Sequence, residues 1–319
     1  MTTATAGGSG VADSSAFSTA ERRAFGQVST DQGRIAVLAA DQRASLARML
    51  AGAGRPSDAA EVLRVKADIV ATLAGSATGV LLDPEIALPA LVDSATVPRD
   101  RALLVSVERS LDRSEPAGRV PALIPGFGAA GVRRLGGTLA KLLVCLRVDR
   151  PDQADTVLGV VRSVLADCHA ASLLLVVEAL VLKDADEDAD AFGRRAPALI
   201  RDAAVAVAET GVAMLKLPYP GSEAASQAVT EAARRPWAVL SGGVGFDAFG
   251  QQLDRALAGG AAGFVAGRAV WQEAVPLAPA ERLGHLREVG RKRLESLTAR
   301  LDGRGSTWQD WDNDAARRG

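Results

Sequence analysis

Short apolar runs alternate along this chain with longer segments of helical periodicity. Eight runs are apolar almost throughout, at residues 35–40, 80–82, 102–107, 141–146, 173–181, 212–217, 237–240 and 263–266. The main helical segments between them lie at residues 58–73, 153–169, 191–209, 223–233 and 250–258. A run without an exposed polar face is typical of a strand buried on both sides in a parallel sheet. The pattern therefore predicts an α/β protein.

The spacing of the eight runs predicts that the sheet closes. The runs begin on average about 33 residues apart, which is the length of one βα unit. Eight such units form a (β/α)8 TIM barrel of about 250 residues. The alternative is a doubly wound open sheet, which would favour a glycine-rich turn after the first strand. That turn here reads Asp41-Gln42-Arg43, so we expect a single TIM barrel.

Three segments follow from this division. Residues 1–17 are small and polar, and we expect a flexible leader. The barrel domain then spans residues 18–301, with a short N-terminal helix that opens at the capping box of Ser18 and Glu21. It ends in a C-terminal helical extension over 281–301. Residues 302–319 form a tail that contains two tryptophans and is expected to be disordered or to dock on a neighbouring molecule.

Composition excludes several classes of protein. Hydrophobic residues make up 48% of the chain and charged residues 24%, with a formal net charge of -1. A disordered chain would be less apolar and a general nucleic-acid binder more basic. No apolar run approaches the roughly 18 residues of a membrane span, and no secretion signal precedes the barrel. We expect a cytoplasmic protein that binds neither nucleic acid nor membranes.

Metal and thiol chemistry find little support in the sequence. The two histidines, His169 and His285, fall on predicted helices without spaced partners. The acidic run 184–188 lacks the glycine and final glutamate of a calcium loop. Cys145 has no histidine near it in sequence and is expected to fill space. We therefore expect no metal and no cofactor.

Lysine is scarce, which makes its positions informative. The five lysines are Lys66, Lys141, Lys183, Lys216 and Lys292, and two of them, Lys141 and Lys216, interrupt apolar strand runs. A buried ammonium is costly unless it is paired, neutral or facing a polar cavity. A lysine acts as a nucleophile once its amine has lost its proton, which a dry surround or a neighbouring cation favours.

Lys216 has the apolar surround, and Lys141 could be the neighbouring cation. The alternative for Lys216 is a salt-bridged lysine that closes the barrel mouth. Lys183 is the rival nucleophile, but it stands beside four acids and is expected to be charged.

In this fold the active site is built at the carboxyl ends of the strands. The polar residues at those ends are Asp41, Gln42, Arg43, Asp83, Glu85, Lys141, Arg147, Asp149, Glu178 and Lys216. Glu178 is flanked by apolar residues, and a buried carboxyl group can donate and accept protons in catalysis. The alternative is that Glu178 forms a structural ion pair with Lys141 or Lys216. Asp41 could instead cap the helix that follows it. Two lysines and two carboxylates from four strands nonetheless converge on one mouth.

Glycines follow the last two strands. Ser241-Gly242-Gly243 comes after the seventh strand and Gly267-Arg268 after the eighth. Barrels commonly hold a phosphate there on backbone N–H groups, and an arginine adds paired donors. The alternative is that these are ordinary turn glycines.

Taken in order, these residues resemble the class I aldolases of the tagatose-1,6-bisphosphate aldolase type, which include sulfofructose-phosphate aldolase. The resemblance covers about residues 30–285. It rests on Asp41-Gln42-Arg43, Lys141, Glu178, Leu215-Lys216-Leu217-Pro218, Leu240-Ser241-Gly242-Gly243 and Gly267-Arg268-Ala269-Val270-Trp271. The chain departs from the family at Cys145-Leu146, where paired tyrosines are frequent, and at Leu217, where glutamate is frequent.

The resemblance implies a role for each of these residues. Lys216 would form the Schiff base, Glu178 would be the acid and base, and Asp41 and Lys141 would assist. The substrate and its phosphate would be held by Gln42, Ser241, Gly242, Gly243, Gly267 and Arg268. Arg147 would contact the distal group of the substrate, which is a phosphate, a sulfonate or a neutral group.

The expected reaction is the reversible cleavage of a ketose 1-phosphate between C3 and C4. The substrate would be of the tagatose or fructose 1,6-bisphosphate type or sulfofructose 1-phosphate, and the products dihydroxyacetone phosphate and an aldehyde. The alternatives are a transaldolase using the same imine, a non-covalent sugar-phosphate-binding barrel, and a barrel epimerase or isomerase. The expected partners are the phosphorylated sugar and further copies of the chain in a homo-oligomer.

Overall fold

Eight parallel strands close into one barrel in a computed structural model that describes residues 16–110 and 120–316. The strands are β1 (Ile35–Ala39), β2 (Gly79–Leu82), β3 (Ala102–Ser106), β4 (Leu139–Cys145), β5 (Leu174–Leu180), β6 (Met214–Leu217), β7 (Trp237–Leu240) and β8 (Gly263–Ala266). They follow one another around the barrel, and β8 pairs with β1. Every strand is buried along its whole length. The predicted TIM barrel is confirmed.

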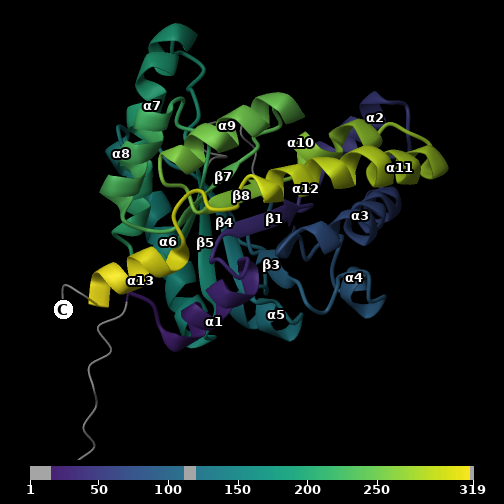
Figure 1. Cartoon of the computed structure of the whole chain (residues 1–319), viewed down its shortest axis with the longest axis horizontal. Coiled ribbons are helices and arrows are strands. Elements are labelled where there is room, and N and C mark those ends of the chain that lie inside the picture. Colours follow the sequence, from purple (N-terminus) through teal and green to yellow (C-terminus); the bar gives the residue numbers. More distant parts are fainter. Residues whose placement is uncertain (1–15, 111–119, 317–319) are drawn as a thin grey trace, which may run out of the picture.

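Helices surround the strands (Figure 1). They are α1 (Thr19–Val28), α2 (Ala44–Gly52), α3 (Ala59–Leu73), α4 (Ala90–Asp93), α5 (Ala129–Arg134), α6 (Pro151–Ala170), α7 (Ala189–Ala208), α8 (Glu223–Ala233), α9 (Phe246–Ala258), α10 (Arg268–Trp271), α11 (Pro279–His285), α12 (Arg291–Ala299) and α13 (Trp308–Ala316). The helix predicted over 281–301 is divided into α11 and α12 by a π-helical turn at Leu286–Gly290. None of the helices in the described part of the chain has the length and hydropathy needed to cross a membrane.

Register within the sheet places charged residues beside one another. Leu143 of β4 pairs with Glu178 of β5, and Glu178 pairs with Lys216 of β6. Side chains alternate between the two faces of a strand, so Lys141 and Leu143 point into the barrel together. The lower part of the barrel interior is filled by apolar residues such as Leu104, Leu174 and Met214. The charged residues therefore lie directly above a closely packed apolar layer.

Helices α1 and α13 lie together at the amino-terminal end of the barrel. The capping box predicted at Ser18 and Glu21 is present at the start of α1. Phe25 of α1 packs among the interior residues and stacks on the Trp308 ring, with 5.4 Å between centroids. The described residues of the tail form α13, which packs on α1 of the same chain. The predicted leader, residues 1–17, falls almost entirely outside the described residues.

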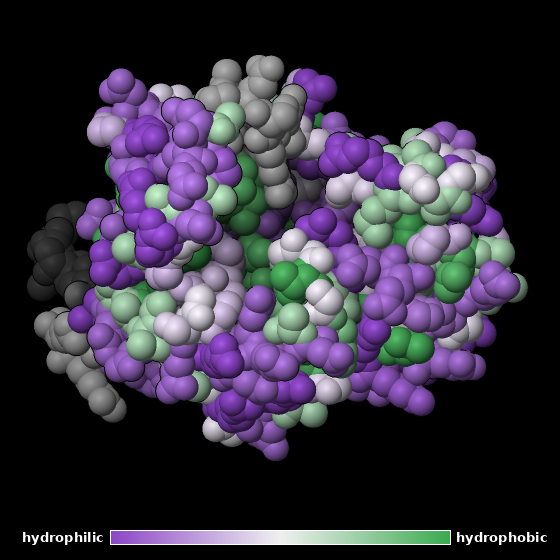
Figure 2. Space-filling view, turned by 90° about the horizontal axis from the view of Figure 1, so that it is seen from above, coloured by the Kyte–Doolittle hydropathy of each residue, from purple (hydrophilic) through white to green (hydrophobic). Residues whose placement is uncertain are grey.

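Hydrophilic residues dominate the face of the molecule seen in Figure 2, whereas hydrophobic ones gather in a recess near its centre. This division is expected of a protein whose apolar runs are buried in the sheet.

Candidate active site

An ammonium group lies between three carboxylates at the carboxyl end of the barrel. Lys141 Nζ is 3.1 Å from Asp41 Oδ2, 2.9 Å from Glu108 Oε1 and 2.9 Å from Glu178 Oε2. Lys216 Nζ lies 2.8 Å from the same Glu178 oxygen. The structure thus brings together Asp41, Lys141, Glu178 and Lys216, which the sequence had placed on four different strands. Glu178 connects the two lysines.

Glu108 belongs to this cluster, although sequence reasoning missed it. It lies two residues after the end of β3, and its side chain is almost fully buried. One carboxylate oxygen contacts Lys141, and the other accepts a hydrogen bond from the Leu143 N–H at 3.2 Å. The signal that could have revealed it was its position directly after the third apolar run, equivalent to Asp41 after the first.

The charges in the cluster fix most protonation states. Burial alone would raise the carboxyl pKa values of Asp41 and Glu178, but the two ammonium groups outweigh it and lower both. Burial would lower the pKa of Lys141, yet its three carboxylates raise it well above the ordinary value. For Glu108 burial prevails over the attraction of Lys141, and its pKa is raised. Lys141 is therefore a permanent cation, and Asp41 and Glu178 are ionised near neutral pH.

A cavity of about 950 Å³ opens above these groups. Both lysines and all three carboxylates line it, together with the predicted substrate-binding residues Gln42, Ser241, Gly242, Gly267 and Arg268. The Oε1 atom of Gln42 is buried there and has no hydrogen-bond partner among the described residues. An unpaired buried amide oxygen is costly, so Gln42 is well placed to accept a hydrogen bond from a ligand hydroxyl.

The loop after β7 and the turn after β8 are joined above this cavity. The Arg268 side chain donates to the Gly242 carbonyl oxygen at 3.0 Å, and the Gly267 N–H donates to Ser241 Oγ at 3.5 Å. Gly243 is absent from the cavity lining and packs instead against Arg268. It adopts φ +91°, and a Cβ there would lie 2.8 Å from the guanidinium carbon. Glycine is required at this position because of both its backbone conformation and the close approach.

Two acids after β2 turn away from the cluster. Asp83, which was expected at the barrel mouth, is fully buried and forms an ion pair with Lys66 of α3. Glu85 forms an ion pair with Arg43. Lys66 lies on α3, and its charge is compensated by Asp83. Neither Asp83 nor Glu85 lines the cavity.

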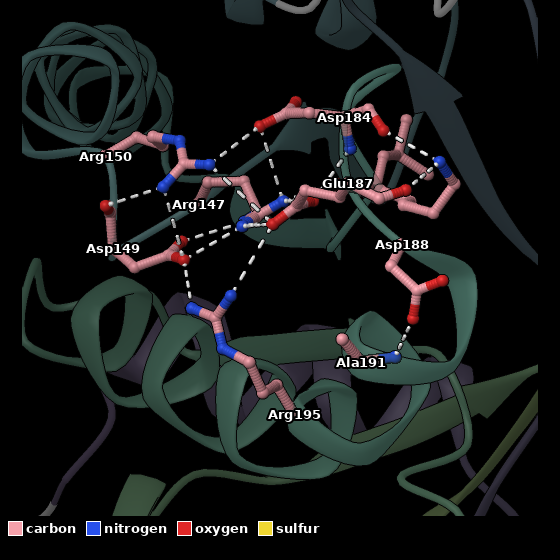
Figure 3. A network of polar contacts seen from close by, with 10 residues as sticks. Arg147, Asp149, Arg150, Asp184, Glu187, Asp188, Ala191 and Arg195 are labelled. Carbon is pink, nitrogen blue, oxygen red and sulfur yellow. Dashed lines mark hydrogen bonds and ion pairs between the residues drawn. The ribbon is translucent and has the colours of Figure 1, made fainter.

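Arg147, which was expected to contact the distal group of the substrate, is engaged elsewhere. Its guanidinium binds Asp149 through two hydrogen bonds of 2.8 Å and Glu187 through bonds of 2.6 and 2.7 Å. It also donates to the Leu182 carbonyl oxygen at 3.0 Å. Figure 3 shows this network between the loops after β4 and β5. Because its donors are bound within the protein and it does not line the cavity, Arg147 acts here as a link between two loops.

The Arg147 network is expected to weaken in acid. Hydrogen bonds from Arg147 and from the Asp184 N–H lower the pKa of Glu187 to about 2. A carboxyl group with a lowered pKa stabilises the folded state fully above its unfolded pKa of about 4.5 and loses that contribution as pH falls toward 2. At pH 7, Glu187→Gln should lower the melting temperature by about 2–4 °C.

Thermal unfolding of both proteins between pH 3 and 7 checks this prediction. The difference in melting temperature should shrink below about pH 4.5. A difference that stays constant down to pH 3 would contradict the proposed ion pair.

Comparisons with known proteins identify a family for this chain and solved structures of similar fold. The family described as DeoC/LacD family aldolase matches residues 35–273. A tagatose 1,6-diphosphate aldolase from Staphylococcus aureus (strain MSSA476) is 26% identical over 314 residues, covering 89% of this chain and 95% of the relative. An archaeal fructose 1,6-bisphosphate aldolase has a similar fold, with 17% identity and a TM-score of 0.62 over 88% of this chain and 98% of its own. The fructose-bisphosphate aldolase from Slackia heliotrinireducens DSM 20476 gives 16% identity and a TM-score of 0.63, covering 89% and 90% of the two chains.

Proposed function

The chain belongs to the DeoC/LacD family of aldolases, and from that premise we propose that it cleaves a ketose 1-phosphate between C3 and C4 through a Schiff base on Lys216. The products are dihydroxyacetone phosphate and an aldehyde. The observation that carries the proposal is the contact of 2.8 Å between Lys216 Nζ and Glu178 in a cavity that also holds Arg268. A solved Schiff base forming fructose-1,6-bisphosphate aldolase has a similar fold.

The two lysines differ in their partners, and this difference assigns their roles. Lys141 is surrounded by three carboxylates that raise its pKa, so its amine keeps its proton. Lys216 contacts Glu178 alone among the described carboxylates. Only an amine that has lost its proton attacks a carbonyl, and Lys216 can pass its proton to the adjacent Glu178 carboxylate, which makes Lys216 the nucleophile. Lys141 then serves as a fixed positive charge that keeps Asp41 and Glu178 ionised.

Imine formation requires an acid and base next to Lys216 that transfers protons between the nitrogen and the carbonyl oxygen. Glu178 takes the proton of the Lys216 ammonium and gives it to the carbonyl oxygen as Lys216 Nζ attacks C2. Glu178 then takes a second proton from the nitrogen and gives it to the hydroxyl, which leaves as water. The protonated imine then withdraws the electron pair of the C3–C4 bond as a base removes the C4 hydroxyl proton. The aldehyde departs, C3 of the enamine takes up a proton, and water hydrolyses the imine. Asp41 is ionised and is our candidate for that base.

The phosphate of the substrate is assigned to the loop and turn beside Arg268. Arg268→Ala should raise KM for a ketose 1-phosphate about ten- to a hundred-fold, because one charge-assisted hydrogen bond is lost. Inhibition by inorganic phosphate should weaken in parallel. Initial rates and phosphate inhibition give both quantities, and Arg255→Ala on α9, outside the cavity lining, is the control. A KM that does not change would place the phosphate elsewhere.

Release of dihydroxyacetone phosphate from a panel of sugar phosphates, with and without EDTA, tests the proposed reaction. Tagatose 1,6-bisphosphate, fructose 1,6-bisphosphate, fructose 1-phosphate and sulfofructose 1-phosphate form the panel. We expect cleavage of at least one, and we expect it to survive the chelator. Complete loss with EDTA that Zn²⁺ restores would overturn the Schiff-base mechanism. Consumption of the sugar phosphate that requires an aldose acceptor and releases no dihydroxyacetone phosphate would indicate a transaldolase.

A further inference from the structure

Leucines line one side of the cavity directly above the charged cluster. We call Leu143, Leu180, Leu182 and Leu240 the leucine wall. Leu143, Leu180 and Leu240 pack together with Cys145 as a cluster distinct from the main core, and Leu182 packs against it. All four leucines line the cavity. The first three are 7–8% exposed, and that small area faces the cavity because they line it.

The position of each leucine follows from strand geometry. Leu143 stands two residues after Lys141 on β4, and Leu180 stands two residues after Glu178 on β5. Residues two apart share a face of a strand, so each leucine lies one step above a charged residue and points the same way. Leu240 directly precedes Ser241 of the proposed phosphate loop. The leucine wall therefore runs from that loop to the far side of the cavity.

The side chains of the leucine wall offer no hydrogen-bond donor or acceptor. A substrate hydroxyl pressed against it would lose its water and stay unpaired, at a cost of about ten-fold in binding. The polar side chains Gln42, Arg43 and Arg109 line the cavity from the loops after β1 and β3 instead. Hydroxyls are thus accommodated on one side of the cavity and hydrocarbon on the other.

Arg147 holds part of the leucine wall in place. Its guanidinium donates to the carbonyl oxygen of Leu182, and the same group is fixed by Asp149 and Glu187 (Figure 3). This network ties the loop that carries Leu182 to the turn after β4. Arg147 is accordingly a positioning residue for the cavity side of that loop.

We propose that the aldehyde fragment of the substrate carries an apolar carbon chain that packs on the leucine wall. The substrate is then a ketose 1-phosphate with hydrocarbon in place of hydroxyls beyond C4, and the acceptor in the reverse direction is an aliphatic aldehyde. This inference rests on the proposed aldolase function.

A binding series that involves no imine tests the leucine wall separately from the chemistry. Ethyl, butyl and hexyl phosphate are titrated calorimetrically into the full chain. Affinity should rise about four-fold for each CH2 that reaches the leucine wall. In Leu182→Asn, a polar replacement of similar size, the increase with chain length should be clearly smaller. Affinity that is independent of chain length in the unchanged protein would overturn the proposal.

A pair of three-carbon acceptors tests the same idea during catalysis. Propanal and D-glyceraldehyde are each condensed with dihydroxyacetone phosphate, and the ratio of their kcat/KM values is the readout. Leu180→Asn and Leu182→Asn should each lower the ratio of kcat/KM for propanal to that for glyceraldehyde about ten-fold. With glyceraldehyde the new amide pairs a hydroxyl that the leucine left without a partner, whereas with propanal the amide itself has no partner. Leu182→Met should keep the ratio, and so should Leu277→Asn, which changes a half-buried leucine outside the cavity lining.

Three outcomes separate the alternatives. Equal slowing with both aldehydes would mean that the leucines only exclude water from the lysines, and it would overturn the proposal. A preference for D-glyceraldehyde over propanal that is the same in the unchanged protein and in Leu182→Asn would overturn it as well. If no aldehyde condenses at all, the proposed aldolase function fails, whereas the alkyl phosphate series still decides whether the leucine wall binds hydrocarbon.

Discussion

Lys216→Met is expected to lose covalent trapping and to lower kcat by at least about 10⁴-fold. The unchanged protein, treated with dihydroxyacetone phosphate and borohydride, should retain one three-carbon adduct per chain. Methionine preserves much of the length of the side chain but has no amine, so no imine can form. Peptide mass spectrometry locates the adduct, and the release of dihydroxyacetone phosphate gives the rate.

Lys183→Met is the matched control for this experiment. Lys183 was the rival nucleophile, but it lies outside the cavity lining and donates at 2.8 Å to the carbonyl oxygens of Asp184 and Glu187. Its replacement should leave the adduct on Lys216. An adduct on Lys141 would reverse the roles of the two buried lysines. The absence of any adduct while ligand binds would favour a non-covalent sugar-phosphate-binding barrel.

Glu178→Gln is expected to lower kcat by about 10²–10⁴-fold while the adduct still forms slowly on Lys216. The amide preserves the shape of the side chain but cannot take a proton from the attacking amine or return it to the leaving hydroxyl. Single-turnover trapping with borohydride at increasing times measures the slowed formation of the imine.

Glu108→Gln provides the comparison for this change. Glu108 contacts Lys141 and the Leu143 N–H but makes no contact with Lys216, so its replacement should slow imine formation much less. Equal losses in the two variants would indicate that Glu178 acts only by balancing charge in the cluster. A kcat within ten-fold of the unchanged protein would remove Glu178 from the proposed mechanism.

Local patterns in the sequence were enough to predict the barrel. Continuous apolar runs and their regular spacing are properties of neighbouring residues, and the family match at residues 35–273 agrees with the resemblance read from motifs after the strands. Once the strands are parallel and closed, their carboxyl ends must meet at one mouth. The convergence of Asp41, Lys141, Glu178 and Lys216 could therefore be expected without a structure.

Which polar residues at the mouth face the cavity was decided by the tertiary structure. Asp83 and Glu108 both follow apolar runs, yet Asp83 pairs with Lys66 outside the cavity, whereas Glu108 binds Lys141 within it. The difference depends on which side chains neighbouring strands and helices bring within reach. No local pattern carries that information.

The partners of Arg147 were likewise decided by the tertiary structure. The sequence placed it at the mouth and predicted a contact with substrate, but the loop after β5 supplies Glu187 and the Leu182 carbonyl oxygen, which occupy its donors. Likewise, Trp308 stacks on Phe25 although nearly the whole chain separates them. The sequence alone determined the strands, their closure and the residues that can reach the mouth. Only the tertiary structure decided how those residues pair, because pairing depends on side chains brought together from distant parts of the chain.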